Sequence, residues 1–142
     1  MRIVISSDKK GLELKNRIVE YLRDQSFEVE DLTPQGDVDF YEASIKVVNE
    51  VLKDVKANKG IIIDEFGAGP FMVADKFKYI ICAELNDEHS AKMTRDHNNA
   101  NVITMGSGVI GEDVACRIAN RLCGTVFRRT SSDPWDMLNK MC

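Results

Sequence analysis

The chain has 142 residues, the size of one domain, and its 19 Lys and Arg residues against 23 Asp and Glu residues give a net charge of −4. This balance leaves no excess of positive charge for a polyanion, so we expect no nucleic-acid partner. The longest apolar runs, such as 61–63 and 79–83, span only a few residues, and polar residues follow Met1 within seven positions. We therefore expect neither a transmembrane helix nor a secretory signal, and place the protein in the cytoplasm.

Short apolar runs alternate with amphipathic stretches along the first half of the chain. The run 2–6 is rich in β-branched residues and predicts a buried strand, followed by an amphipathic helix over 10–24. Alternation over 27–32 predicts a second strand. The clearest helical stripe covers 40–55, and the run 60–64 predicts a third strand.

The second half continues the alternation. We expect Asn86 to cap one of its helices, with Asp87 and Glu88 in the first turn. The expected elements are a short helix over 71–77, a strand over 79–84, a helix over 86–98, a strand over 101–106, a helix over 111–123 ended by Gly124, and a last short helix over 133–141.

Five strands separated by helices predict an α/β fold, a three-layer α/β/α sandwich with a five-stranded parallel, Rossmann-like sheet and a C-terminal helix, forming one domain over 1–142. We expect the first strand to lie centrally in the sheet. Such sheets bind ligands beyond the carboxyl ends of their strands, which directs attention to 6–11, 64–71, 84–87 and 105–111.

Cysteine and histidine usage argues against disulfides and metal sites. No two of the four cysteines have the spacing of a CxxC motif, and we expect all of them to be free thiols in a reducing compartment. Only two histidines are present, so a histidine-rich metal site is not available. The cysteines are Cys82, Cys116, Cys123 and Cys142.

A glycine-containing loop follows the third predicted strand, with the sequence DEFGAGP over 64–70. Gly67 and Gly69 would let backbone amides approach an anion closely, or would serve a tight turn that needs a positive φ. The loop lacks the Gly-Lys-Ser/Thr ending of a Walker motif and the third glycine of a dinucleotide-binding motif. Both interpretations remain open at this point.

Asp8 ends the first predicted strand and is suited to cap the following helix. Asp8 together with Asp64 also suggests a phosphoacceptor receiver domain. That fold would need a lysine at the end of the fifth strand, where Thr104 and Met105 stand, and a second acid beside Asp8. We therefore reject the receiver interpretation.

Polar residues crowd the end of the 86–98 helix. Arg95, His97, Asn98 and Asn99 can serve as helix C-terminal residues, because asparagine tolerates the left-handed conformation and a protonated histidine gains from the helix dipole. The other interpretation, which we favour, is a polar cluster that handles a proton and a sugar hydroxyl near neutral pH. His89, in the first turn of this helix, is expected to be a surface residue.

Four segments of the chain resemble a known family. They are SSDKKGLELK (6–15), GIIIDEFGAGPFMVADKF (60–77), TRDHNNANVITMGSGVIG (94–111) and DMLNKMC (136–142). These segments resemble the A subunits of galactose-6-phosphate isomerases, within the wider family of type B ribose-5-phosphate isomerases. The resemblance implies a reversible conversion of D-galactose 6-phosphate to D-tagatose 6-phosphate in bacterial lactose and galactose breakdown. It also implies a cis-enediolate mechanism without metal or other cofactor, at active sites built across a subunit interface.

The resemblance assigns part of the site directly. The family's ring-opening histidine and the asparagine beside it fall on His97 and Asn98. The family's strand-one motif SDHAG becomes SDKKG here, so Asp8 is retained while Lys9 replaces the histidine. His97 is thus the expected catalytic residue, with Asn98 and Asp8 expected to bind substrate.

The glycine loop departs from the family pattern. The catalytic cysteine of the family's CGTGIG motif falls on Asp64, and the threonine that holds the enediolate oxygen falls on Phe66. Gly67 and Gly69 are kept and are expected to contact substrate, whereas Pro70 occupies the position of the glutamate that some members use.

The family's C-terminal arginine pair, which binds phosphate, is also incomplete. Arg128 and Arg129 lie nearby in the sequence, but Pro134 stands in place of the second arginine. Phe40, Tyr41 and Arg95 are further candidates to line the pocket.

These departures predict a subunit that supplies half of an active site. His97 and Asn98 would reach into a site whose base, oxyanion donor and arginines come from a paralogous subunit of a hetero-oligomer. Three alternatives remain: a homo-oligomeric pentose-phosphate isomerase that uses Asp64 as base, a purely structural subunit, and a non-catalytic sugar-phosphate sensor.

Overall fold

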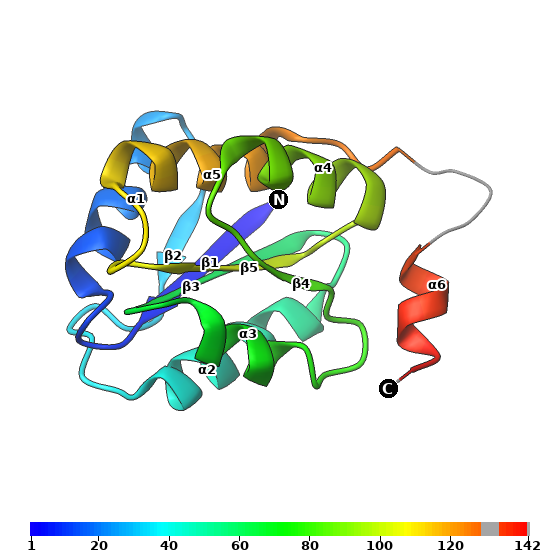
Figure 1. Ribbon diagram of the computed structural model, residues 1–142, viewed down its shortest axis with the longest axis horizontal. Helices are drawn as coiled ribbons and strands as arrows, with labels where there is room; N and C mark the ends of the chain where they lie inside the picture. Colours follow the sequence, from blue (N-terminus) through cyan, green and yellow to red (C-terminus); the bar gives the residue numbers. More distant parts are fainter. Residues whose placement is uncertain (129–133, 142) are drawn as a thin grey trace.

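A computed structural model describes residues 1–128 and 134–141 of the chain. Strands and helices alternate from the amino terminus, as the apolar periodicity predicts (Figure 1). The elements are β1 (Arg2–Ser7), α1 (Leu12–Asp24), β2 (Val29–Asp31), α2 (Phe40–Lys53), β3 (Asn58–Asp64), α3 (Ala68–Ala74), β4 (Cys82–Glu84), α4 (Glu88–Asn98), β5 (Val102–Gly106), α5 (Glu112–Gly124) and α6 (Pro134–Asn139).

The five strands form one parallel sheet in the order β2-β1-β3-β5-β4. Strand β1 lies between β2 and β3, one place from the centre of the sheet, and the central position expected for it belongs to β3. All seven residues of β3 are buried, because helices cover both of its faces. The predicted α/β class with a five-stranded parallel sheet is confirmed.

The helices form two layers around the sheet. Helices α1, α4 and α5 cover one face and α2 with α3 the other, while α6 stands at the side of the molecule next to α4 (Figure 1). Successive residues of β1 point to opposite faces: Ile3 and Ile5 pack in the core under α1 and α5, and Val4 packs under α2. The sheet is thereby buried on both sides.

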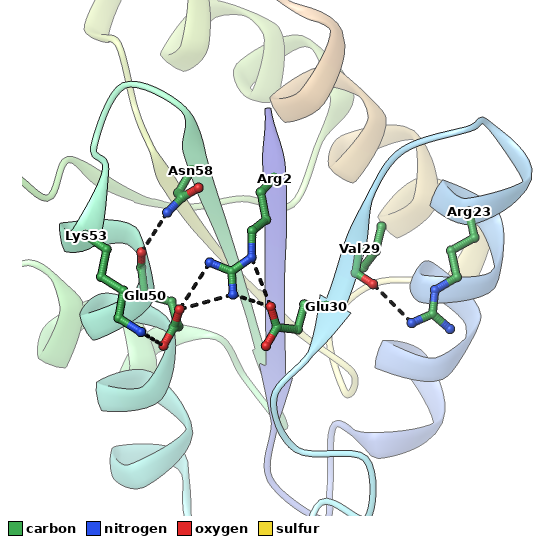
Figure 2. Close-up of polar contacts among 7 residues, drawn as sticks. All are labelled: Arg2, Arg23, Val29, Glu30, Glu50, Lys53 and Asn58. Carbon is green, nitrogen blue, oxygen red and sulfur yellow. Dashed lines mark hydrogen bonds and ion pairs between the residues drawn. The ribbon is translucent and has the colours of Figure 1, made fainter.

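Charged residues tie the amino ends of the strands together (Figure 2). The Arg2 guanidinium on β1 donates to the carboxylate of Glu30 on β2 and to Glu50 on α2, the latter at 3.1 Å. Lys53 donates to the second oxygen of Glu50, and the Asn58 side chain donates to the backbone carbonyl of Glu50 at 2.9 Å. This network fixes the end of α2 against the first residues of β1 and β3.

Several element boundaries differ from the prediction. Helix α4 is capped by Asp87, whose carboxylate accepts the Ser90 N–H at 2.7 Å, so the expectation that Asn86 is the cap is wrong by one residue. Helix α3 begins three residues earlier than predicted, because Gly67 supplies the turn that starts it. Gly124 lies within α5, and Thr125 follows as its cap.

Among the described residues, Cys82, Cys116 and Cys123 are free and buried, as predicted, whereas Cys142 and Asp133 lie outside the described part. No helix in the described ranges is long and apolar enough to cross a membrane.

Candidate active site

The loops after β1, β3 and β5 meet at the carboxyl edge of the sheet. Gly106 at the end of β5 pairs with Asp64 at the end of β3. Beyond it, the Ser107 N–H donates to the Asp64 carbonyl at 2.8 Å, and the Ser107 hydroxyl donates to the Lys10 carbonyl at 2.9 Å. Asp8 holds the first of these loops, since its carboxylate accepts the N–H of Gly11 at 2.9 Å. The structure therefore brings the predicted residues of the glycine loop and Asp8 to one edge.

Asp8 is not the direct cap of α1. Gly11 occupies the N-cap position without a side-chain hydrogen bond, and Asp8 stabilises the turn that leads to it. The cap interpretation of Asp8 is thus wrong by three residues.

Asp64 turns its carboxylate inward to the glycine loop. The side chain is buried, and one of its oxygens accepts the N–H groups of Phe66, at 3.2 Å, and of Gly67. Burial raises the pKa of Asp64, the hydrogen bond from Gly67 opposes this effect, and the neighbouring Asp8 carboxylate raises the pKa further. The Asp64 carboxylate thus occupies two backbone N–H groups of this loop. Those N–H groups are therefore not free to bind an anionic substrate.

The two glycines of the loop serve different local needs. Gly67 has φ 82° and caps α3, which confirms that a tight turn with positive φ is required there. At Gly69 an added Cβ would come within 2.9 Å of the Phe40 ring, so this glycine makes room for an aromatic side chain of α2. Phe66, which stands in place of a hydroxyl donor, is 59% exposed. The loop therefore exposes an aromatic ring at the position where the resemblance implies a hydroxyl.

His97 and Asn98 lie at the opposite edge of the sheet. Helix α4 runs antiparallel to the strands and delivers its end to the start of β5, where the Asn101 N–H donates to the Ile81 carbonyl at 3.0 Å and the Asn101 carbonyl accepts the Gly60 N–H at 2.8 Å. His97 and Asn98 are both exposed there. One chain therefore does not bring His97 and Asn98 to Asp8 and the glycine loop.

Arg128 is held beside the end of α4. Its guanidinium makes two hydrogen bonds to the buried Asp96 carboxylate, one of them at 2.6 Å, and these bonds lower the pKa of Asp96. Arg128 is exposed at the same edge as His97, whereas Arg129 lies outside the described residues. His97, Asn98 and Arg128 are thus presented together on the outside of the molecule.

The other candidates for the pocket are divided between the two edges. Phe40 and Tyr41 form a shallow groove with Gly69 near the glycine loop. Arg95 instead faces a cavity at the amino edge together with Lys59, a residue that the sequence analysis did not single out. The sequence held one signal for Lys59: this lysine stands directly before the apolar run of β3. The structure shows that the whole strand is buried.

Comparison with known proteins decides the family. Residues 3–134 match the model of the ribose/galactose isomerase family. The chain belongs to this family. It is 46% identical over 143 aligned residues, covering all of both chains, to galactose-6-phosphate isomerase subunit LacA of Lactococcus lactis, and likewise 46% identical to the LacA subunit of Streptococcus mutans. These matches confirm the predicted resemblance to this family and the prediction that the chain is an isomerase.

Solved structures of this family share the fold. Ribose-5-phosphate isomerase B of Mycoplasma genitalium, determined with bound ribulose-5-phosphate, has a TM-score of 0.89 and 29% identity over 99% of this chain and 93% of its own. The Clostridium thermocellum ribose-5-phosphate isomerase B has a TM-score of 0.87 and 31% identity over 99% of this chain and 95% of its own.

Proposed function

We propose that this chain is a subunit of a cytoplasmic galactose-6-phosphate isomerase, which interconverts D-galactose 6-phosphate and D-tagatose 6-phosphate in lactose and galactose breakdown. In this proposal the chain contributes His97 and Asn98 to an active site that it shares with a paralogous subunit. Full-length identity of 46% to subunits with that name supports the substrate.

One observation supports a shared site: the candidate residues of a single chain lie at two opposite edges of the sheet. His97 and Asn98 are exposed at the end of α4, while Asp8, Gly67 and Gly69 lie at the other edge of the sheet. An aldose–ketose isomerase needs a group at the ring oxygen close to a base at the carbon and to donors at the developing oxyanion. In this proposal a second chain brings such partners to His97.

The chemistry divides accordingly. The imidazole of His97 would move a proton at the ring oxygen, and the Asn98 amide would hydrogen-bond a sugar hydroxyl. The Arg128 guanidinium at the same edge is engaged by Asp96, and in this proposal the arginines that bind the substrate phosphate come from the paralogous subunit. The base that moves the proton between C2 and C1 would come from the paralogous subunit.

The glycine loop of this chain is a poor site for the same chemistry. Asp64 occupies the N–H groups of Phe66 and Gly67, and the Asp64 and Asp8 carboxylates together would repel a phosphate dianion at this loop. In the proposal this loop is therefore not catalytic, and Asp8, Gly67 and Gly69 maintain its structure.

The experiment is an isomerase assay of the chain alone and mixed with its paralogous subunit, with galactose 6-phosphate as substrate. Activity is expected only in the mixture, and His97→Ala is expected to lower kcat by about 100-fold or more. His89→Ala is the matched control, because His89 is an exposed histidine on the same helix. Asp64→Asn should leave turnover in the mixture nearly unchanged.

Each alternative predicts a different result. Turnover of ribose 5-phosphate by the chain alone, lost in Asp64→Asn, would identify a homo-oligomeric isomerase with Asp64 as its base. A mixture that keeps full activity with His97→Ala would mean a structural subunit. Binding of sugar phosphate by the chain alone, without turnover in any mixture, would indicate a sensor.

A further inference from the structure

A cavity of about 700 Å³ lies at the amino edge of the sheet, between the ends of α2 and α4 and the helix α6. Leu52 and Phe127 contribute apolar surface to it. The rings of Tyr79 and Trp135 line it from a third side and stack with their centroids 6.1 Å apart. Its size is in the range that proteins use for small-molecule ligands.

Three cationic side chains line this cavity, namely Lys56, Lys59 and Arg95, and of these only Lys56 is exposed. Lys59 is only 3% exposed, and its ammonium donates to the backbone carbonyls of Lys56 at 2.9 Å and Asn58 at 3.1 Å. The half-buried Arg95 guanidinium donates to the Asn99 side chain. Within the described part of the chain, neither Lys59 nor Arg95 forms an ion pair with a carboxylate.

The acidic groups around the cavity do not cancel this charge. Asp54 acts on Lys59 only at a distance, because its carboxylate accepts two backbone N–H groups at the end of α2. Glu50 is engaged by other cations, as Figure 2 shows. Asp136 is the one described acidic residue in the lining, and it is exposed on α6. Burial and the charge of Arg95 lower the pKa of Lys59 to about 8, so its ammonium is still protonated at neutral pH.

We propose that this cavity binds a phosphorylated small molecule, with the phosphate against Lys59 and Arg95 and the remainder of the molecule along Tyr79 and Trp135. The buried Lys59 and the half-buried Arg95 lack the carboxylate counter-charge that proteins normally supply, and a phosphate dianion provides it with acceptors for both. The aromatic rings offer a face for a sugar or a base.

This site is separate from the proposed active site. Successive residues of an α-helix are about 100° apart, so His97 points about 200° away from Arg95 around α4. His97 is exposed, whereas Arg95 is turned toward the start of β3. None of His97, Asn98 and Arg128 lines the cavity, so in this proposal a ligand in it acts as an effector and not as the substrate being converted.

Trp135 makes the proposal testable in the unmodified chain, because it is the only tryptophan in the sequence and lines the cavity. We would titrate the full chain, without any paralogous subunit, with pyrophosphate, ATP and galactose 6-phosphate, following tryptophan fluorescence and the heat of binding. At least one of these probes is expected to change the fluorescence and to bind with a Kd of about 1 mM or tighter.

Variants locate the binding. Lys59→Met and Arg95→Gln are each expected to weaken binding by about tenfold or more, the usual effect of losing a charge-assisted hydrogen bond. Lys46→Gln is the matched control, since Lys46 is a partly exposed lysine of α2 paired with Glu42 and lies outside the cavity lining. It should bind like the parent chain. Tighter binding of ATP than of galactose 6-phosphate would support a nucleotide as the ligand, and the reverse order would support a sugar phosphate.

Two results would overturn the proposal. One is the absence of both a fluorescence change and a heat of binding with all three probes. The other is binding that persists unchanged in both Lys59→Met and Arg95→Gln, which would place the ligand elsewhere. Neither result bears on the shared active site, because the measurement uses the chain alone and no turnover.

Discussion

Replacing Lys59 by methionine removes a buried charge and keeps a flexible side chain of similar length. Lys59 is 3% exposed, and its pKa falls from 10.5 to about 8 because burial, and secondarily the charge of Arg95, disfavour the ammonium. A shift of that size corresponds to roughly 3 kcal/mol of lost stability at pH 7. The two hydrogen bonds from Lys59 to backbone carbonyls offset about 1 kcal/mol of this cost, and the substitution removes them as well. Lys59→Met is therefore expected to stabilise the chain by about 2 kcal/mol.

The stability gained by Lys59→Met depends on pH, because only the parent chain can lose the Lys59 proton. Below pH 8 the folded and unfolded chains both hold the Lys59 proton, and the full cost is present. Between about pH 8 and 10.5 the unfolded chain binds more protons than the folded one, so the stability of the parent chain rises with pH. The advantage of Lys59→Met should therefore shrink across this window and disappear by about pH 10.5.

Urea denaturation of both proteins at several pH values measures the difference directly. At pH 7 the midpoint temperature of Lys59→Met should also rise by about 2–4 °C for each kcal/mol gained. Lys46→Met, with Lys46 at the surface of α2, should change stability by less than about 0.5 kcal/mol and show no such pH window. A stability difference that stays constant from about pH 7 to 10.5 would refute a lowered pKa of Lys59 in the folded chain.

Three further substitutions test the fold around the sites. Gly67→Ala is expected to cost about 1–3 kcal/mol of unfolding free energy, because φ is 82° at this position, and a loss below about 0.5 kcal/mol would contradict the turn described here. Asp31→Ala should cost about 3–5 kcal/mol, since it leaves the fully buried ammonium of Lys15 without its ion pair at 2.6 Å; urea denaturation near wild-type values would exclude that pair as a stabilising contact. Because Arg128 lowers the pKa of Asp96, the stability that this pair provides is present above the ordinary pKa of 3.8 and is lost as the pH falls below it. Arg128→Gln should therefore be less stable than the parent at pH 6 and converge with it in acid, and a difference that persists in acid would be inconsistent with the pairing.

The fold followed from the sequence because its signals are local. The β-branched run of β1 and the continuous apolar run of β3 could be buried only in a sheet covered on both faces, and the apolar stripe of α2 could be buried only against such a sheet. Helix ends were predicted less accurately. The cap of α4 moved from Asn86 to Asp87, since both residues favour that position and only the backbone conformation decides between them.

The proposed site was predicted in part. The sequence identified His97 and Asn98 by their resemblance to a family motif, and it identified the departures at Asp64 and Phe66. It could not show that Asp64 occupies the N–H groups of its own loop, because that depends on the conformation of Gly67. Nor could it show that His97 lies at the opposite edge from the glycine loop.

The sequence by itself determined the alternation of strands and helices, the family and the residue types available for catalysis. Only the tertiary structure decided which of these residues meet. Lys59 and Arg95 are 36 positions apart and come together because the starts of β3 and β5 share one edge of the sheet, where α4 ends. Hydrophobic periodicity specifies which face of each element is buried, whereas the neighbours of a side chain at a sheet edge depend on strand order, which a local pattern does not encode.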